Sequence, residues 1–578
     1  MIIKKIVIKN FRNLENVVIE NESNMKYVIG NNGVGKSNLL EAINYFFNKS
    51  SFSLEDFYNE DKSIEIQMSL LLNEFELGYF DDFFDLDNEN IINIKAVQET
   101  PIDRIEYYHI DTGSAISYQK IRNLPCVYYN SVNAPEELTF MKTKTSGQFL
   151  NSLIENYINI NEVKVDGLLN TGEINNISNH LNEILNLISF VQNNDLSVVI
   201  EKNIVDLLPR LMELKNKDNM SINRMGSGVR YSSYIYFELL NKIMQTVEKK
   251  KDSIIENDNG KKYISMFIFL DEPEIHLHPY MQRSVISDIK NIINNKDTLF
   301  LSLLKKIFNI DGIFGQLIVV THSPNIISNN FREIIRLDYD NIKKVKAYSG
   351  FNCEITDKEE KQFLLHNFKI KEAFFAKTCI VVEGQTERIV LPIFAEKMGL
   401  SLDGLNIGII EADGADSIPI VTTLLNHFGI KNICIIDKDK YKEDYSLIYP
   451  NIKHTKYTFF EEDFIRKILF NKRTHILYQI ARDCGDKMDL FIQKGAIEKV
   501  NKRIEINDVI YDNFKLCDTL KSSNYFQKLL VLVTWLYNKK STLESTILAK
   551  NCAVEDIPDI YKEIIIKAVI YAKKWSNA

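Results

Sequence analysis

The sequence contains a glycine-rich segment of the kind that binds nucleotide phosphates. Residues 30–37 read Gly-Asn-Asn-Gly-Val-Gly-Lys-Ser, between an apolar run at 26–29 and a helix-like segment at 38–47. Such glycines let backbone N–H groups turn toward phosphate oxygens, while the lysine contacts the β- and γ-phosphates and the serine hydroxyl ligates Mg²⁺. The flanking strand and helix argue against a chance glycine turn. We predict a nucleotide site formed by Asn32, Gly33, Gly35, Lys36, Ser37 and Asn38.

Two later segments carry side chains that would complete this site. Residues 267–272 form an apolar strand ending in Asp271 and Glu272, and His322 ends a second apolar strand. Strand ends of this kind meet at the carboxyl edge of a parallel sheet, where nucleotides bind. Asp271 would join the Mg²⁺ shell, Glu272 would orient and deprotonate the attacking water, and His322 would contact the γ-phosphate. A lone surface histidine or acidic pair would mean little, but the ordered set predicts ATP hydrolysis.

A second set of carboxylates lies in the C-terminal half. Glu383 ends an apolar strand, Glu387 follows one helical turn later, and Asp437 and Asp439 follow another strand; a glycine turn at 411–416 lies between them. Positions i and i+2 of an extended segment point the same way. Converging carboxylates repel one another unless a divalent cation lies among them, and oxygen ligands favour Mg²⁺ or Mn²⁺. Two unrelated acidic turns are the alternative, but their order and strand context favour a metal site.

The elements that must hold these residues can be read from the hydrophobic pattern. From residue 376 onward, apolar strands alternate with helix-like segments, which predicts a parallel sheet flanked by helices, and after about 464 the pattern is mainly helical. Residues 140–220 favour helices, for example at 174–190. The stretch 338–356 is polar and irregular, and we expect it to close the first domain. In the N-terminal part we expect strands at 1–9, 26–29, 63–71, 263–270 and 316–320.

Composition narrows the classes of protein. The 578 residues allow roughly three to five domains, and 70 Lys+Arg against 78 Asp+Glu give a net charge of −8. A nucleic-acid partner must therefore be held by a local basic surface or by bridging metal ions. The seven cysteines are scattered without a C-x-x-C pair, which argues against a zinc ribbon and suits a reducing compartment. No apolar run approaches the roughly 20 residues of a membrane span, so we expect a cytoplasmic protein without membrane contact.

The N-terminal motifs resemble those of the ABC-type ATPase head, in its SMC-like branch. The resemblance rests on the phosphate loop, on DEPEIHLHP at 271–279 and on THSP at 321–324, and it covers residues 1–345. It implies ATP and Mg²⁺ as cofactors and a composite site completed by a second head. The segment at 225–230 departs from the usual signature, but its Ser227 and Gly228 are the best match for the residues that contact the opposing γ-phosphate.

Other interpretations of this half are weaker. His276 and His278 have the spacing of a zinc pair, although the resemblance explains them better. Without membrane spans the chain is not a fused transporter. No heptad array lies between Lys36 and Ser227, which excludes a long coiled-coil arm. We therefore expect a compact helical insertion that serves dimerisation.

The C-terminal carboxylates resemble those of the TOPRIM domain, over residues 375–465, and the combination with an ATPase head resembles the OLD (overcoming lysogenization defect) nucleases, which include the Gabija-type nuclease subunit. The resemblance implies two metal ions, one near Glu387 and Asp439, the other near Glu383 and Asp437. A later acid would complete the ligands, with Glu461 and Asp463 as candidates. A C-terminal lysine is also implied, for which we favour Lys540; a solvated basic helix end is its alternative.

The predicted fold class is α/β, with a helical tail. The expected segments are the ATPase head at 1–139 and 221–345, the dimerisation insertion at 140–220, the TOPRIM core at 375–465 and the helical C-terminal part at 466–578. The predicted function is an ATP-regulated DNA endonuclease of anti-phage defence that uses Mg²⁺ or Mn²⁺. Its expected partners are double-stranded DNA, further copies of the chain in a homodimer or larger homo-oligomer, and a helicase-like or retron protein. A tRNA-cutting toxin and a non-catalytic DNA-repair scaffold remain as alternatives.

Overall fold

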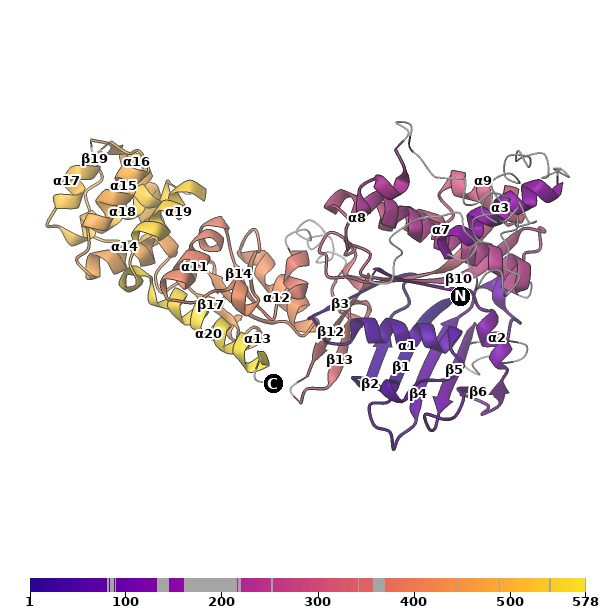
Figure 1. The fold of residues 1–578 in the computed structure, drawn as a ribbon. Coiled ribbons are helices and arrows are strands. Elements are labelled where there is room, and N and C mark those ends of the chain that lie inside the picture. The colour runs from indigo at the N-terminus through magenta and orange to yellow at the C-terminus, as the bar shows by residue number, and fades with distance from the viewer. Residues whose placement is uncertain are drawn as a thin grey trace, which may run out of the picture.

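The computed structural model describes residues 1–80, 90–131, 145–160, 220–250, 253–340, 342–356, 370–443, 445–487, 489–539 and 542–576, together with Phe83, Asn88 and Asn216. The N-terminal part carries two sheets, and the C-terminal part extends from one side of it, beyond β12 and β13 (Figure 1). No helix among these residues is long and apolar enough to cross a membrane.

A seven-stranded sheet forms the centre of the N-terminal part. Its order is β13-β12-β3-β11-β10-β8, with β9 paired to β10, and the pairs from β12 through β8 are parallel. The carboxyl ends of β3, β10 and β11 therefore lie along one edge. The strands are β3 (Met25–Gly30), β8 (Cys126–Asn130), β9 (Ile254–Glu256), β10 (Lys262–Asp271), β11 (Gly312–Val320), β12 (Ile334–Tyr339) and β13 (Val345–Ser349).

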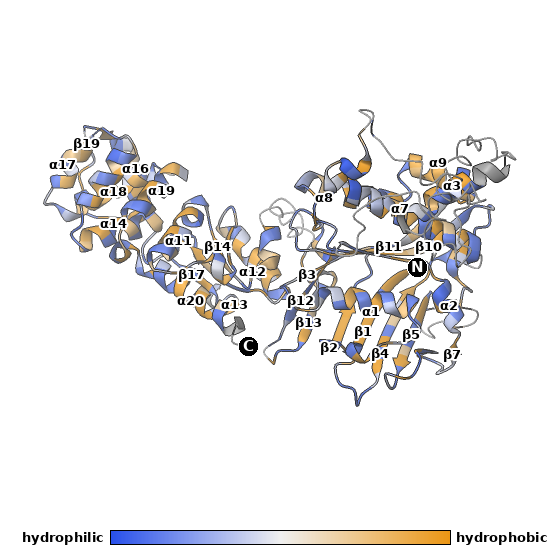
Figure 2. Cartoon of the chain, in the orientation of Figure 1, coloured by the Kyte–Doolittle hydropathy of each residue, from blue (hydrophilic) through white to orange (hydrophobic). Residues whose placement is uncertain are grey.

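A second, antiparallel sheet covers one side of α1 (Lys36–Asn48). Apolar residues of this sheet share one buried cluster with α1 and with β10, β11 and β12, so α1 is packed between the two sheets. The strands β1, β4 and β5 beside α1 carry many hydrophobic residues, drawn in orange (Figure 2). The strands are β2 (Leu14–Glu20), β1 (Ile2–Phe11), β4 (Ile64–Leu71), β5 (Ile91–Gln98), β6 (Glu106–His109) and β7 (Ala115–Ile116), and α2 (Tyr118–Asn123) follows β7.

Helices cover the other face of the seven-stranded sheet. Residues from α7 (Ser227–Lys249), α8 (Pro279–Ile293) and α9 (Thr298–Phe308) join the alternate side chains of β10 and β11 in a second cluster. The helix α3 (Thr145–Ile160) packs against α7. Most of the segment at 140–220, including the helix expected at 174–190, lies outside the described residues, so the proposed dimerisation insertion stays a prediction.

The C-terminal part is built on a four-stranded parallel sheet, β15-β14-β16-β17. Alternate side chains of β14 and β16 face opposite sides: one side packs on α11 and α20, the other on α12. The expected alternation of strands and helices is therefore confirmed. The elements are β14 (Thr378–Val382), α11 (Gln385–Lys397), β15 (Ile407–Glu411), α12 (Ile418–His427), β16 (Lys431–Ile436), α13 (Tyr445–Ile448) and β17 (Ile452–His454).

The remaining residues are mainly helical, as expected, and they share one apolar core with the parallel sheet. The helices are α14 (Phe460–Phe470), α15 (His475–Asp483), α16 (Lys494–Ile504), α17 (Leu516–Lys521), α18 (Tyr525–Tyr537), α19 (Thr542–Asn551) and α20 (Asp559–Ser576), with a two-stranded sheet of β18 (Phe491–Ile492) and β19 (Phe514–Lys515). The last helix, α20, returns to the sheet and contacts β14 and β16.

The expectation that residues 338–356 are irregular was wrong. The end of β12 and the whole of β13 lie in this stretch, and the antiparallel hairpin that they form contacts the C-terminal part. Arg336 of β12 is fully buried and donates to the carbonyl oxygens of Phe374 (3.1 Å), Phe428 (2.9 Å) and Ala376 (3.4 Å). The buried Arg336 guanidinium thus connects β12 of the N-terminal part with three carbonyls of the C-terminal part.

Replacing Arg336 with methionine is expected to lower the free energy of unfolding by about 3 kcal/mol, because it leaves Asp338, its ion-pair partner at 2.5 Å, and three carbonyls buried without their donor. Urea unfolding followed by tryptophan fluorescence measures the change. Lys346→Met, at an exposed position on β13, is the matched control and should stay within about 0.5 kcal/mol of the wild type. An equally small effect of Arg336→Met would contradict the structural role.

Stability should also depend on pH through Lys26 of β3. Its ammonium donates to the Ile3 carbonyl, and burial lowers its pKa to about 7. Since the unfolded chain keeps the ordinary value of 10.5, the unfolded state binds more protons between about pH 7 and 10.5. The free energy of unfolding should therefore rise with pH across this window, with a contribution from Lys26 of about 1.4 kcal/mol per pH unit at most, and Lys26→Met should reduce the rise. Urea titrations at pH 7 and 9 test this; a flat wild-type profile would contradict it.

Candidate nucleotide and metal sites

The predicted nucleotide-binding side chains line one cavity at the carboxyl edge of the seven-stranded sheet. Its volume is about 610 Å³. It joins three segments far apart in the sequence: the loop after β3, the turn after β10 and the turn after β11. The lining residues are Asn32, Gly33, Gly35, Lys36, Ser37, Asn38, Glu272, Glu274, Ile275 and His322.

The loop after β3 needs its glycines for steric reasons. Gly35 has φ 102°, and a Cβ there would lie 2.6 Å from the Asn13 side chain. At Gly30, φ is 146° and a Cβ would lie 2.3 Å from the Leu337 carbonyl oxygen of the neighbouring strand β12. Any other residue at these positions would push the loop away from β12 and from the turn after β1. The helix α1 begins directly after this loop, so its N-terminus faces the cavity.

Lys36 and Ser37 are poised at the start of α1. The Lys36 ammonium donates to the carbonyls of Gly30 (3.0 Å) and Asn31 (2.9 Å). A bound phosphate could replace these carbonyls as its hydrogen-bond acceptor. Burial lowers its pKa to about 8. The Ser37 hydroxyl donates to Asp271 at 3.1 Å, and burial raises the pKa of Asp271 to about 6. A hydroxyl and a carboxylate in contact are the two ligands that a nucleotide-bound Mg²⁺ takes from such a site.

Glu272 and His322 lie together beside this pair. His322 Nε2 is 3.3 Å from the Glu272 carboxylate. Glu272 has φ 51°, a left-handed backbone that a non-glycine residue rarely adopts, and strain of this kind is typical of functional turns. Glu274 accepts the His322 backbone N–H at 2.6 Å and so fixes the turn that carries the histidine. Burial, and then the nearby Lys36, lower the pKa of His322, which favours the neutral imidazole.

Ser227 and Gly228 do not line this cavity. They begin α7, where the Ser227 hydroxyl is 3.5 Å from the His276 carbonyl oxygen and a Cβ on Gly228 would lie 2.9 Å from Met281 Sδ. The His276 ring stacks on Tyr231 at 4.7 Å. This packing accounts for His276 without a metal. A role for Ser227 and Gly228 in the site of a second head stays a prediction.

Sequence reasoning missed the support that the turn between β1 and β2 gives to α1. Arg12, with φ 47°, donates to Asn38 (2.8 Å) and pairs with Glu41 (2.7 Å), and Asn38 in turn donates to Asn13 (2.8 Å). These bonds hold the first turn of α1 against the antiparallel sheet. No spacing rule links position 12 to position 38, although an Arg-Asn pair in a turn ahead of a phosphate loop would have been the signal to examine.

In the C-terminal part, the predicted carboxylates meet at the carboxyl edge of the parallel sheet. Glu383 directly follows β14, and Asp437 directly follows β16, its neighbour in the sheet. Glu383 accepts the Asp437 backbone N–H at 3.4 Å, which links the two strand ends. Glu387, in the first turn of α11, and Asp437 are 9% and 8% exposed. Asp439 lies in a short 3₁₀ turn after β16.

Two cations hold the outer carboxylates of this group. Lys440 pairs with Glu383, and Arg503 of α16 donates through Nε to Asp439 at 2.9 Å. The described residues contain no group of three or more Asp, Glu, His or Cys side chains already in metal-binding geometry. With Glu383 and Asp439 turned toward cations, these carboxylates compensate their repulsion with lysine and arginine.

The later acids approach the same place from α14. Tyr561 of α20 is fully buried, and within the described part of the chain its hydroxyl has no hydrogen-bond partner. Burial raises its pKa well above the ordinary value, and the charges of Glu387, Asp437, Asp463 and Glu461 raise it further. The negative charges of four carboxylates therefore act on this one buried hydroxyl. Oxygen donors of this number and charge fit a divalent ion such as Mg²⁺.

The two candidate metal ligands of α14, Glu461 and Asp463, differ in their hydrogen bonds. Both oxygens of Asp463 accept backbone N–H groups, from Tyr457 (2.6 Å) and Lys456 (2.9 Å), and burial raises its pKa to about 6. These bonds hold the loop before α14. Glu461 is also buried, at 2% exposed. Because both oxygens of Asp463 already accept backbone N–H groups, the geometry favours Glu461 over Asp463 as the later ligand. Lys540 lies outside the described residues.

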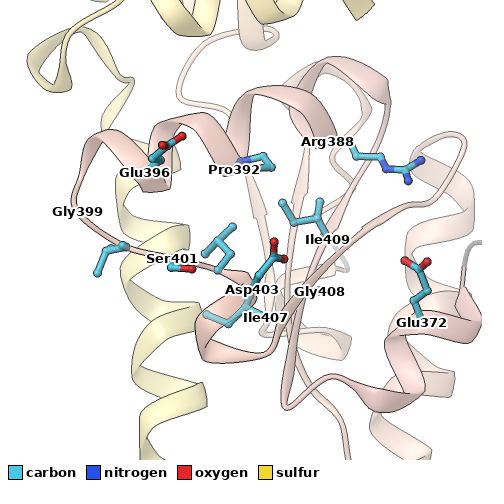
Figure 3. A pocket seen from close by; sticks show the side chains of 12 residues that line it. Glu372, Arg388, Pro392, Glu396, Gly399, Ser401, Asp403, Ile407, Gly408 and Ile409 are labelled. Atoms are coloured by element: carbon cyan, nitrogen blue, oxygen red, sulfur yellow. The ribbon is translucent and has the colours of Figure 1, made fainter. Parts of the chain in front are cut away.

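A separate cavity of the C-terminal part is not lined by these carboxylates. It has a volume of about 640 Å³ and lies along the outer edge of β15, between α11 and the turn at residues 399–403. Arg388, Glu396 and Asp403 point into it from different elements (Figure 3). None of the predicted site residues lines it.

Two family models match the chain. The model described as "AAA ATPase domain" matches residues 1–122 and 117–327, more than half of the chain, and "Overcoming lysogenization defect protein-like, TOPRIM domain" matches residues 374–439. Among solved structures, the SMC head bound to the C-winged helix domain of ScpA gives a TM-score of 0.33 at 19% identity, covering 60% of this chain and 98% of that one. The C-terminal region of the Xanthomonas campestris OLD protein gives 0.25 at 16%, covering 35% and 96%.

Curated relatives are distant. Two proteins named Endonuclease GajA, from Bacillus cereus strains HuB5-5 and VD045, are each 23% identical and cover 67% and 75% of this chain. The Old nuclease of Escherichia phage P2 is 26% identical over 38% of the chain. The alignments span 53%, 74% and 33% of these relatives, so the chain matches only about half the length of the first. The chain belongs to the AAA ATPase domain family and carries, after that domain, a TOPRIM domain of the overcoming-lysogenization-defect type, which confirms the α/β fold class and the resemblance.

Proposed function

We propose that the chain is an ATP-regulated, divalent-metal-dependent DNA endonuclease. The observation that carries the proposal is the meeting of Glu383, Glu387 and Asp437 at the carboxyl edge of the parallel sheet, with Glu461 beside them. Bound Mg²⁺ or Mn²⁺ would supply an activated water and neutralise charge on the scissile phosphate. The TOPRIM match and the names of the relatives support this activity.

The ligands fall into two groups in this proposal. Glu383 and Asp437, joined through the Asp437 N–H, would hold one ion, and Glu387, Asp439 and Glu461 the other. The buried Tyr561 hydroxyl would orient these carboxylates by donating to one of them. The ion pairs of Glu383 with Lys440 and of Asp439 with Arg503 must break when metal ions bind these carboxylates.

The ATPase head would control when this site works. Lys36, Ser37 and Asp271 would bind Mg-ATP, and Glu272 with His322 would position the attacking water and the γ-phosphate. Ser227 and Gly228 would act on the nucleotide of a second head, which makes a homodimer the expected working form. A defence role, with or without a helicase-like or retron partner, belongs to the same proposal.

A plasmid assay tests the function most directly. Supercoiled plasmid incubated with the protein and Mg²⁺ or Mn²⁺, with and without ATP, should be nicked or linearised, and EDTA should prevent this. Parallel reactions with tRNA separate a nuclease that acts on DNA from one that acts on RNA. Cleavage of tRNA but not plasmid would contradict the proposed substrate, and cleavage of neither, with intact Mn²⁺ binding, would favour a scaffold.

A further inference from the structure

Arg503 enters the candidate metal site from a helix that sequence reasoning had left without a role. It lies at the end of α16, and its guanidinium donates through both Nε and Nη2 to the same oxygen of Asp439. Of the predicted ligands, Asp439 is therefore the one whose carboxylate is held by a cation from the helical C-terminal part.

The guanidinium is also held by contacts that do not involve Asp439. Nη1 donates to the Tyr537 hydroxyl at 2.7 Å. The guanidinium carbon lies 4.6 Å from the centre of the Phe459 ring and 5.3 Å from that of Tyr537. An arginine seated against two aromatic rings keeps its orientation when one of its partners leaves. The side chain is still 28% exposed, so its donors remain open to a ligand from solution.

Lys440 provides the contrast. It holds Glu383 in the same way, but its side chain is 46% exposed and no aromatic ring contact is described for it. A lysine ammonium on a flexible stem can swing away without leaving a fixed donor behind. The two cations of the site are thus not equivalent: one is an adaptable counter-charge, and the other is a preset pair of N–H donors.

From these contacts we propose that Arg503 is a phosphate-binding residue of the nuclease site. Its Nε and Nη2 both bond one oxygen of Asp439 in the structure; where a divalent ion takes that carboxylate, the same two donors bind a phosphate oxygen of the DNA strand. Guanidinium groups bind carboxylate and phosphate through the same paired N–H geometry, which makes the exchange chemically direct. This inference rests on the proposed function, because it names how that site holds its substrate.

The first test measures metal binding without any cleavage. Mn²⁺ is titrated into the full chain, and free Mn²⁺ is followed by electron paramagnetic resonance. Arg503 competes with the ion for Asp439. The Mn²⁺ affinity of Arg503→Met should therefore be no lower than that of the wild type, and we expect it to be about threefold higher. The matched control is Arg473→Met, since Arg473 pairs with Glu555 in the same helical region and contacts none of the site residues. Weaker Mn²⁺ binding by Arg503→Met alone would overturn the proposal, because Arg503 would then be ordering a metal ligand.

The second test measures the substrate. Binding of a DNA duplex in Ca²⁺, and single-turnover cleavage at saturating Mn²⁺, are compared for the same proteins. Loss of two charge-assisted N–H donors should weaken DNA binding by about tenfold and slow cleavage by about 100-fold in Arg503→Met, with Arg473→Met unchanged. DNA affinity at the wild-type level in Arg503→Met would overturn the proposal.

A conservative variant covers loss of folding. If Arg503→Met unfolds at a lower temperature than the wild type, Arg503→Lys decides, since it keeps the charge but loses the paired donors. It should bind DNA less tightly than the wild type while its Mn²⁺ affinity is undiminished; full DNA affinity would overturn the proposal. If the wild type cleaves neither DNA nor RNA, the proposed function fails. The Mn²⁺ and DNA-binding measurements still test whether Arg503 binds phosphate.

Discussion

Glu383→Ala is expected to reduce metal-dependent DNA cleavage by more than about 10³-fold while leaving ATP binding at the wild-type level. Glu383 follows the central strand β14 and receives the Asp437 N–H, so its loss removes a ligand and loosens the neighbouring one. A missing carboxylate ligand leaves an ion without the charge and orientation that two-metal hydrolysis requires. The nucleotide cavity is lined entirely by the N-terminal part and should be unaffected.

The measurement is single-turnover plasmid cleavage in Mn²⁺, with ATP binding followed by a fluorescent analogue. Glu396→Ala is the matched control, because Glu396 lies on the same domain, in α11, but is exposed and borders the cavity beside β15. The control should cleave at the wild-type rate. Metal-dependent nicking that persists in Glu383→Ala would refute the placement of the nuclease site.

Glu272→Gln is expected to slow ATP hydrolysis by at least about 100-fold and to preserve Mg-ATP binding. The amide keeps the shape of the side chain but cannot accept a proton from the attacking water, and it leaves His322 without its carboxylate partner. The residues proposed to hold Mg-ATP, Lys36, Ser37 and Asp271, are not changed by this substitution.

Phosphate release under excess ATP gives the hydrolysis rate, and equilibrium binding of labelled ATP gives the affinity. Glu256→Gln, at an exposed position on β9 of the same sheet, should leave both unchanged. A parallel loss of affinity in Glu272→Gln would assign Glu272 to the strained turn, at φ 51°, instead of to the chemistry.

Most of the residues that line the candidate nucleotide cavity could be brought together from the sequence. Lys36, Asp271 and His322 each follow an apolar strand, and parallel strands bring their carboxyl ends to one edge whatever the length of chain between them. The same rule brought Glu383 and Asp437 together. Periodicity and strand ends carry this information because they depend on neighbouring residues only.

Contacts between remote side chains carry no such local signal. Arg503 meets Asp439 across 64 positions, and Tyr561 reaches the carboxylates from the last helix. The stretch 338–356 was misread for a related reason: it is polar in sequence, although Asp338 at its start is paired with the buried Arg336, which also donates to a carbonyl of the C-terminal part. A buried charge that finds its partners in another domain is invisible to a hydropathy pattern.

The position of Arg336 has a mechanical consequence. It lies on β12, opposite Ile29 in the register with β3, one residue before the phosphate loop begins. β3, which ends in that loop, is thus hydrogen-bonded to β12, and Arg336 of β12 donates to the Phe428 carbonyl of the C-terminal part. Bending between the two parts would have to break a fully buried cluster of charged hydrogen bonds. Displacement of β12 relative to the C-terminal part would therefore strain its pairing with β3 just before the phosphate loop.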